Sequence, residues 1–208
     1  MFPFLTRDDV FRIETPRLWL RWPRLEDATF MALWVGLPRV ATMTSTFKVD
    51  MRVGEVRERL EQVRASNIAG RGFAFVMTPK GADASAIGML GVSVQPGGRM
   101  ELGYLLDPDH WGAGLMTEAV SALCEQAFDL MPIANIGAST RPENGASIRL
   151  LKKCGFKLTG TGEHESAVYG RYPVISYGLA RARPSPLLAA QHRRAAGPKV
   201  EHELVRLV

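Results

Sequence analysis

Short apolar runs bounded by proline and glycine alternate along this chain with stretches of helical spacing, which predicts a mixed α and β fold. The run at 17–22, after the Thr15-Pro16 pair, has the large apolar residues of a first strand. Apolar residues three and four positions apart predict a helix over 25–35 and another over 53–63, the second capped by Asp50. No segment repeats at a fixed period, so solenoids and propellers are excluded.

The middle of the chain predicts a meander of strands followed by one long helix. Three apolar runs, at 73–77, 86–94 and 99–106, are separated by Pro-Lys-Gly and Pro-Gly-Gly, which favour tight turns between antiparallel strands. A helix is expected over 114–130, with Glu118 among the polar residues of its outer face. Its apolar face would consist of Met116, Ala119, Leu123, Ala127 and Leu130.

The last third of the domain predicts three more strands and a helix. A short strand at 135–140 is followed by a helix at 145–154 that ends at Gly155. Two further strands are expected on either side of a loop at 161–172.

Composition fits one globular domain. The 208 residues are 46% hydrophobic and 23% charged, which excludes a disordered chain and allows a full core. The uncharged stretches are too short to span a membrane, and charges at positions 7–9 exclude a signal peptide, so we expect a cytoplasmic protein. Two cysteines, Cys124 and Cys154, form neither a disulfide framework nor a four-cysteine metal site, and no metal is expected.

The segment 181–208 differs from the rest of the chain and is expected to be a basic C-terminal tail after a domain at 1–180. It holds six basic and two acidic side chains and thus +4 of the net charge of +5. Such a tail could touch RNA, but no RNA-recognition motif accompanies it, so nucleic-acid binding is disfavoured. The tail could also dock on a second copy in a homodimer, and we expect it to be dispensable for chemistry.

The most informative segment runs from 105 to 119, where a strand ends and a helix begins after two spaced glycines. Gly112 and Gly114 allow backbone conformations that other residues avoid, and the helix behind them presents unpaired N–H groups. Together they are typical of a phosphate cradle, although an ordinary turn has the same pattern. The segment lacks the Gly-Lys-Ser/Thr ending of a Walker loop and the third glycine of a dinucleotide fingerprint.

A second segment, 139–156, places polar side chains at the start of another helix. Asn144 is in the position of an ordinary helix cap. Ser147 lies one turn further on, where its hydroxyl could serve a ligand.

These motifs together resemble the GNAT superfamily of acetyl-CoA-dependent N-acetyltransferases. The resemblance rests on W-G-x-G, T-E-A and R-P-E-N-x-x-S-x-x-L-x-x-K-x-G-F, in that order after a strand. The opening T-P-R-L-W-L-R at 15–21 is similar to the branch that acetylates the N-termini of ribosomal proteins. The resemblance covers about 13–180.

The resemblance implies an α/β fold of the α+β type, with a mixed, mostly antiparallel, V-split sheet flanked by helices. Acetyl-CoA would lie in the split as the acyl donor, and its pantetheine arm would pair with Leu105 and Leu106 and contact Asn144. Its pyrophosphate would rest on the backbone of the segment Trp111, Gly112, Ala113, Gly114, Leu115 and Met116, with Thr117 beside it. Met116 is bulkier than the family's usual small residue at this position.

Attack of an amine on a thioester requires a neutral amine and a donor for the leaving thiolate. Glu101 shares a strand face with Leu105, so it is the candidate base, although a solvent-facing glutamate has the same pattern. In the family branch that it resembles, a glutamate at this position takes the amine proton. Ser147 would be the acid by the same resemblance, with Tyr169 and Tyr172 as weaker alternatives.

Two other chemistries are less favoured by the sequence. His110 and His164 could act as bases, but His110 has the context of a loop residue. Neither cysteine has a histidine nearby, and Cys154 lies at a helix C-terminus, which disfavours a thiolate and therefore a covalent intermediate.

The sequence therefore predicts transfer of acetyl from acetyl-CoA to a primary amine, by direct attack in a ternary complex. The acceptor would be a protein N-terminus or a small amine, chosen by residues of 34–51 and 160–172. The alternative is a catalytically silent acyl-CoA-binding or regulatory module, in which Glu101 is only a surface charge.

Overall fold

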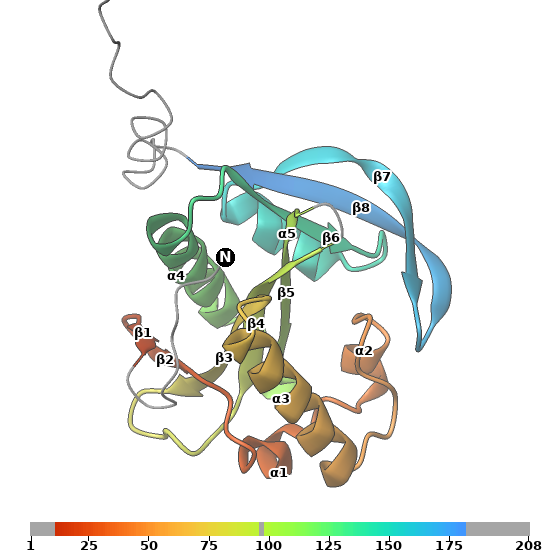
Figure 1. Ribbon diagram of the computed structural model, residues 1–208. Coiled ribbons are helices and arrows are strands. Elements are labelled where there is room, and N and C mark those ends of the chain that lie inside the picture. Colours follow the sequence, from red (N-terminus) through yellow and green to blue (C-terminus); the bar gives the residue numbers. More distant parts are fainter. Residues whose placement is uncertain (1–10, 96–97, 182–208) are drawn as a thin grey trace, which may run out of the picture.

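The computed structural model describes residues 11–95 and 98–181, so residues 1–10 and the expected tail beyond Arg181 lie outside the described residues. A mixed sheet runs through the molecule with the strand order β1-β2-β3-β4-β5-β6-β8-β7 (Figure 1). The strands are β1 (Arg12–Glu14), β2 (Leu18–Arg21), β3 (Gly72–Pro79), β4 (Gly88–Val94), β5 (Met100–Leu106), β6 (Asn135–Thr140), β7 (Lys157–Ser166) and β8 (Gly170–Ala180). The helices are α1 (Asp27–Met31), α2 (Pro38–Ala41), α3 (Val53–Ile68), the 3₁₀ turn η1 (Pro108–His110), α4 (Leu115–Leu130) and α5 (Gly145–Lys153).

The sheet is split between its two central strands. All neighbouring strands pair antiparallel except β5 and β6, which run parallel. These two strands pair at only two positions, Glu101 with Gly137 and Leu102 with Ala138, and then diverge. The predicted mixed, mostly antiparallel, V-split sheet is therefore confirmed.

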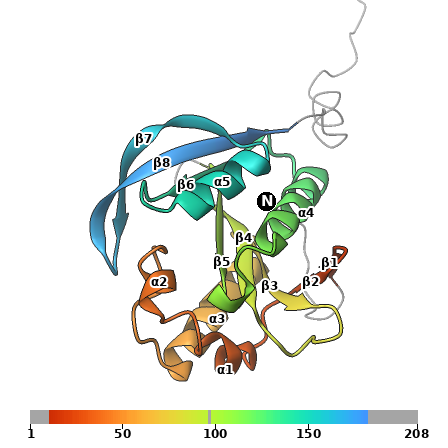
Figure 2. The same cartoon turned by 180° about the vertical axis from the view of Figure 1, so that it is seen from behind.

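Two apolar clusters cover the two faces of the sheet. On one face α4 and α5 pack together, and fully buried residues such as Leu123 and Leu151 join the core beneath them. On the other face α1, α2 and α3 enclose a separate cluster that contains Met31, Val56 and Leu60 (Figure 2). The split between β5 and β6 thus lies between two independently packed layers.

Most elements expected from the apolar spacing are present. The meander appears as β3, β4 and β5, the long helix as α4, and the strand at 135–140 as β6. The helix α5 ends where Gly155 takes a φ of 85°, which is the left-handed conformation expected of a C-terminal glycine.

The N-terminal helical region differs from the expectation. The helix α1 has five residues, and turns continue the chain to the short helix α2, where one longer helix was expected. Asp50 does not cap α3, because the N-cap is Arg52, whose N–H donates to Glu55 Oε2. Asp50 takes a φ of 59° and donates its N–H to the carbonyl of Gly36, which closes a turn instead.

The final hairpin is longer than expected. Strand β7 extends to Ser166 and β8 begins at Gly170, so the turn contains only 167–169. The expected loop at 161–172 is therefore wrong, and Tyr172 lies in a strand. Pairing of the two strands over their whole length explains the difference, because cross-strand contacts override the polar composition of this region.

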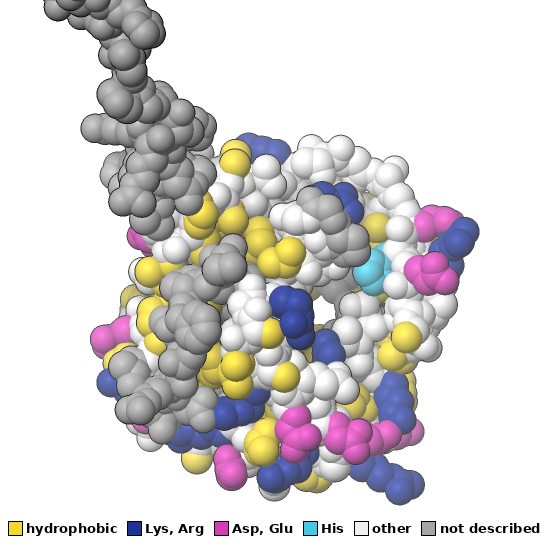
Figure 3. Space-filling view, viewed as in Figure 1, with side chains coloured by type: hydrophobic (Ala, Val, Ile, Leu, Met, Phe, Trp, Pro, Cys, Tyr) yellow, Lys and Arg dark blue, Asp and Glu magenta, His cyan; other side chains and the backbone are white. Residues whose placement is uncertain are grey.

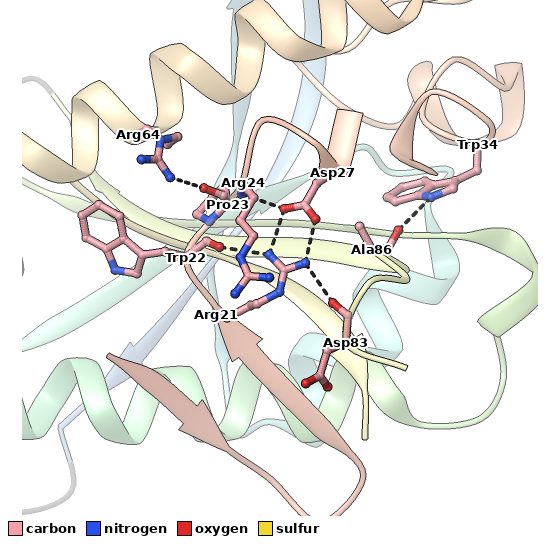
Figure 4. A network of polar contacts seen from close by, with 9 residues as sticks. All are labelled: Arg21, Trp22, Pro23, Arg24, Asp27, Trp34, Arg64, Asp83 and Ala86. Carbon is pink, nitrogen blue, oxygen red and sulfur yellow. Dashed lines mark hydrogen bonds and ion pairs between the residues drawn. The ribbon is translucent and has the colours of Figure 1, made fainter. Parts of the chain in front are cut away.

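A buried ion pair fixes the first helical region against the sheet (Figure 4). Arg21 at the end of β2 donates to both carboxylate oxygens of Asp27, at 2.9 and 2.6 Å, and to the carbonyl of Asp83 at 3.1 Å. The indole N–H of Trp34 donates to the carbonyl of Ala86 at 3.2 Å. These contacts place the segment after α1 beside the end of the β3–β4 connection.

Two further findings concern the class of protein. No helix in the described ranges is long and apolar enough to cross a membrane. Within those same ranges no three His, Cys, Asp or Glu residues come together as metal ligands.

Candidate functional site

The two glycines before α4 both have left-handed backbones. Gly112 has a φ of 78° and Gly114, the N-cap of α4, a φ of 76°, and residues with a side chain rarely adopt this conformation. A Cβ atom at Gly112 would meet nothing within 4 Å, so the backbone here faces open space. The first N–H groups of α4 precede its first intrahelical bond, from Glu118 to the carbonyl of Gly114, and remain available to an anion. We call residues 111–117 the glycine loop.

The bulky side chain of Met116 does not obstruct the glycine loop. It is 5% exposed and belongs to the apolar cluster under α4. The side chain of Met116, which is larger than the family's usual residue here, therefore packs into the core and leaves the loop open.

A set of hydrogen bonds ties the glycine loop to the turn between β1 and β2. Arg17 donates from Nη1 to the carbonyl of Ala113 at 2.9 Å and from Nε to Glu118 Oε2 at 2.7 Å. Thr15 Oγ1 donates to Glu118 Oε1 at 2.6 Å. Burial raises the pKa of Glu118, but the hydrogen bonds from Thr15 and Arg17 outweigh it and hold this pKa below its usual range. Glu118 therefore holds the glycine loop through these hydrogen bonds. It was expected on the outer face of the helix, but its side chain is largely covered by these contacts.

The strand end that leads to the glycine loop has a free edge. Beyond Leu102, strand β5 pairs with no other described residue on the side of β6, although β4 pairs with it along its whole length. Leu105 and Leu106 lie in this unpaired part. The carbonyl of Leu106 accepts a hydrogen bond from Trp111 Nε1 at 2.9 Å, so the indole lies against the end of the strand and remains half exposed.

Glu101 lies where the split between β5 and β6 begins. A Cβ atom at Gly137 of β6 would come within 2.9 Å of Glu101 Oε2, so the carboxylate lies directly across from this glycine and a side chain there would displace it. Glu101 is half-buried, and its side chain forms no hydrogen bond or ion pair with another residue in the described part of the chain.

The N-terminus of α5 brings Asn144, Ser147 and Tyr104 together. Asn144 Oδ1 accepts a hydrogen bond from the N–H of Ser147 at 3.0 Å, which confirms Asn144 as the cap of α5. The amide nitrogen of Asn144 remains available as a donor. Ser147 is 9% exposed, and its Oγ lies 2.7 Å from the hydroxyl of Tyr104 in β5.

The alternation of β5 places these groups on opposite faces of the strand. Glu101 and Leu105 lie on one face, where Leu105 packs against the cluster under α1 to α3. Tyr104 lies on the other face and packs against the cluster under α4 and α5. A carboxylate and a pair of hydroxyls thus approach the free edge of β5 from its two sides.

The hairpin of β7 and β8 reaches across to the segment after α2. Ser166 Oγ donates to the carbonyl of Ser45 at 2.6 Å, and the hydroxyl of Tyr169 donates to the carbonyl of Phe47 at 2.9 Å. We call these two contacts the hairpin bridge. The surface is hollowed between the hairpin and the body of the molecule, with Lys and Arg side chains beside the hollow (Figure 3).

Two arginines lie against aromatic rings, one in the hairpin and one in the glycine loop. Arg141, just after β6, stacks on the ring of Tyr172 with 3.4 Å between the guanidinium carbon and the ring centre. Arg39 of α2 lies 5.9 Å from the ring centre of Trp111 in the glycine loop. The chain therefore encloses the open end of the split through β6, the hairpin, α2 and the glycine loop.

A cavity of about 310 Å³ lies beside α2, between the segment after α1 and the turn η1. Trp34, Arg39 and His110 are among the residues that line it. Residues of the segment 34–51, expected to choose the acceptor, thus border both this cavity and the hairpin bridge.

The alternative catalytic groups are less suited to their roles. The hydroxyl of Tyr169 is engaged in the hairpin bridge, and burial raises the pKa values of both Tyr169 and Tyr172. Burial also raises the pKa of Cys154 and raises that of Cys124 to about 12, so neither thiol is a ready nucleophile. His110 lies in η1 with its Nδ1 3.5 Å from Asp107 Oδ2.

Several residues of this site were not anticipated from the sequence. Gly137, Arg17 and Arg39 act through contacts between segments far apart in the chain. Tyr104 could have been found, because strand alternation places it opposite Glu101 and two residues from Leu106.

Comparison with known protein families agrees with this geometry. Residues 17–157 match the family model described as an acetyltransferase (GNAT) domain, which covers more than half of the chain. The protein described as uncharacterized N-acetyltransferase p20 of Bacillus licheniformis is 34% identical over 149 residues, or 70% of this chain and 82% of that protein.

Solved structures show the same fold. Mycobacterium smegmatis RimJ in complex with CoA-disulfide superposes with a TM-score of 0.70 at 23% identity, covering 95% of this chain and 98% of RimJ. The ribosomal-protein-S5-alanine acetyltransferase of Vibrio fischeri superposes with a TM-score of 0.70 at 22% identity, covering 85% of this chain and 100% of that one.

Proposed function

Because the chain belongs to the GNAT family of N-acetyltransferases, we propose that it transfers acetyl from acetyl-CoA to a primary amine by direct attack, with both substrates bound together. The observation that carries this proposal is the arrangement about β5. An unpaired carboxylate, Glu101, lies on one face of the strand, and the Ser147 hydroxyl approaches from the other.

The acetyl-CoA site is proposed in the split, along the free edge of β5. The left-handed glycines and the unpaired N–H groups of α4 suit the pyrophosphate, with Thr117 beside it. The main chain of Leu105 and Leu106 would pair with the pantetheine arm, and Asn144 would donate to it from its free amide. The complex of RimJ with CoA-disulfide supports a coenzyme A site in this fold.

Glu101 is proposed as the base. Its carboxylate has no other partner among the described residues and lies where the split begins, within reach of an amine at the free edge of β5. An N-terminal α-amine has a pKa of about 7.7–8.0, so roughly 10% of it is neutral at pH 7. A lysine amine with a pKa of about 10.4 is neutral only about 0.04% of the time, so a single carboxylate is better matched to the α-amine.

Ser147 is proposed as the donor to the leaving sulfur. It lies in the first turn of α5, next to the Asn144 cap, and its hydroxyl is directed into the layer on the far side of β5 from Glu101. As the amine nitrogen bonds to the thioester carbon, charge moves to the carbonyl oxygen and then to sulfur, where a hydroxyl donor stabilises it.

The acceptor is proposed to be an α-amine at the end of a peptide, with a small primary amine as the second candidate. The chain encloses the open end of the split through the hairpin bridge and α2, and such an enclosure favours a group that enters end-on. The Vibrio fischeri structure, described as a ribosomal-protein-S5-alanine acetyltransferase, supports a protein acceptor.

Mass spectrometry of a mixture of peptides and small amines after incubation with acetyl-CoA tests this proposal. We expect one acetyl group on the N-terminus of some peptides. Binding of acetyl-CoA with no acceptor modified would favour the silent module, and modification of lysine side chains alone would contradict the proposed acceptor. A cytoplasmic location and a homodimer stay predictions.

A further inference from the structure

The hydroxyl of Tyr104 has one partner in the described structure, the Oγ atom of Ser147 at 2.7 Å. The two residues come from β5 and α5, 43 positions apart in the chain. Tyr104 is half-buried and packs against the apolar cluster under α4 and α5. The contact is therefore a built feature of the site and not a chance encounter at the surface.

Either oxygen of the pair can donate in this contact, and the two arrangements have different consequences for Ser147. A phenol in an apolar layer has one hydrogen to place, and Ser147 Oγ is the acceptor within reach. If Tyr104 donates, Ser147 accepts with one lone pair and keeps its own hydrogen for another group. If Ser147 donated instead, its hydrogen would be used by Tyr104 and not by the sulfur; only the first arrangement leaves the serine hydrogen for the ligand.

We propose that Tyr104 is a positioning residue, whose hydroxyl donates to Ser147 Oγ, turns the serine hydrogen toward the sulfur of the departing coenzyme A and strengthens that hydrogen bond. The inference rests on the proposed function, which places the sulfur beside Ser147. Hydrogen bonds in a chain polarise one another, so the serine O–H becomes a better donor when its oxygen accepts from Tyr104.

The reaction balances without a proton from Tyr104. The amine nitrogen forms a bond to the thioester carbon, the C–S bond breaks, and its electron pair stays on sulfur. One proton passes from the amine to Glu101, and the thiolate departs with the Ser147 O–H as its hydrogen-bond donor and takes a proton from solvent after release. Tyr104 keeps its own proton because burial raises its pKa to about 12, whereas a free thiol titrates near 8.5.

The first test compares Tyr104→Phe with the wild-type enzyme. The variant keeps the ring and removes the hydroxyl, so kcat should fall roughly five- to tenfold, the loss expected for one hydrogen bond. The dissociation constant for acetyl-CoA and the KM for the acceptor should not change. Tyr177→Phe is the matched control, since Tyr177 is buried in the same cluster away from Ser147 and should keep its rate.

The second test asks whether Tyr104 acts through Ser147. Tyr104→Phe is measured in the wild-type and in the Ser147→Ala background. We expect the effect of Tyr104→Phe on kcat to vanish in the Ser147→Ala background, because the serine hydrogen that Tyr104 orients is absent there. An equal loss in both backgrounds, or a loss accompanied by weaker acetyl-CoA binding, would overturn the inference and indicate a packing role.

A third measurement does not depend on turnover. The thiolate of bound coenzyme A is followed by ultraviolet absorbance as pH rises, with the protein alone as the blank, because its two cysteines titrate late. The oriented serine hydroxyl stabilises the thiolate. At a given pH, the fraction of bound coenzyme A that is thiolate should therefore be several-fold larger in the wild type than in Tyr104→Phe. Identical titration curves would overturn the inference. Failure of the wild type to acetylate any amine would instead overturn the proposed function.

Discussion

The cofactor side and the acceptor side of the site are assembled over very different distances along the chain. The glycine loop occupies 111–117, and the cap of α5 joins residues three positions apart. The hairpin bridge joins residues 121 and 122 positions apart. The motifs of the first side are local, although Arg17 also ties its glycine loop to the turn between β1 and β2, whereas the second side depends on contacts between distant segments.

The two sides also differ in the chemical groups that they use. The cofactor side depends on residue types with special backbone or capping properties, namely glycine and asparagine. On the acceptor side, both hydrogen bonds of the hairpin bridge end on backbone carbonyls, which every residue type provides. On this proposal, a change of acceptor specificity requires no change in the motifs assigned to the cofactor.

The largest expected effect comes from Gly114→Asp in the glycine loop. The substitution places a side chain on a left-handed backbone and a carboxylate among the N–H groups proposed for the pyrophosphate. Loss of two charge-assisted hydrogen bonds corresponds to an affinity for acetyl-CoA that falls on the order of a thousandfold. Calorimetry with acetyl-CoA measures it.

The matched control is Gly98→Asp. Gly98 also has a left-handed backbone, with a φ of 75°, and a Cβ atom there would meet nothing within 4 Å. It should carry a similar backbone strain and bind acetyl-CoA as the wild type does. An unchanged affinity of Gly114→Asp for acetyl-CoA would show that the pyrophosphate does not bind at the glycine loop.

The next effect is that of Glu101→Gln, which keeps the shape of the side chain and removes the proton acceptor. The rate at neutral pH should fall about a hundredfold, within the range for general base catalysis, with acetyl-CoA affinity unchanged. The rate should recover as pH rises through the amine's own pKa. The pH profile of kcat/KM checks this, with the exposed Glu125→Gln as control. If Glu101→Gln kept the wild-type rate at every pH, Glu101 would be only a surface charge.

A smaller effect is expected at the hairpin bridge. Tyr169→Phe removes one of its two hydrogen bonds, so the KM for the acceptor should rise roughly fivefold while acetyl-CoA affinity holds. Leu158→Ala, at an exposed position of β7, is the control on the same hairpin. A change in acetyl-CoA affinity instead would mean that the two sides are not separable.

The smallest effect is expected from removal of the basic tail. A chain that ends after Arg181 should keep its turnover of a small amine within about twofold, since it keeps every residue assigned to the site and surface changes away from a site usually cost about 0.5 kcal/mol or less. Arg181 itself donates to the carbonyls of Phe128, Met131 and Ile133, at the C-terminal end of α4. A chain that ends after Ala180 loses these bonds and should unfold at a lower temperature. Loss of activity in a folded chain ending after Arg181 would assign part of the acceptor site to the tail.

The sequence predicted the fold class and most elements because their signals are local. Apolar periodicity identified α4, proline and glycine turns identified the meander, and Gly155 marked the end of α5. The short elements were missed, since β1 and α2 have too few residues to show a period.

The site could be predicted only as far as its motifs reach. Sequence placed Asn144 as a cap and Gly114 at the start of α4, and both are confirmed. It could not show that Glu118 pairs with Arg17, because that contact joins residues 101 positions apart. The roles of Glu101 and Ser147 stay predictions, now supported by their places on either side of β5.

Initial rates measured while both acetyl-CoA and an accepted amine are varied test the central claim most directly. If the two substrates meet across β5 in one complex, double-reciprocal plots should give intersecting lines, and the protein's own mass should not change with acetyl-CoA alone. Parallel lines together with an acetylated protein would show a covalent intermediate and contradict direct transfer.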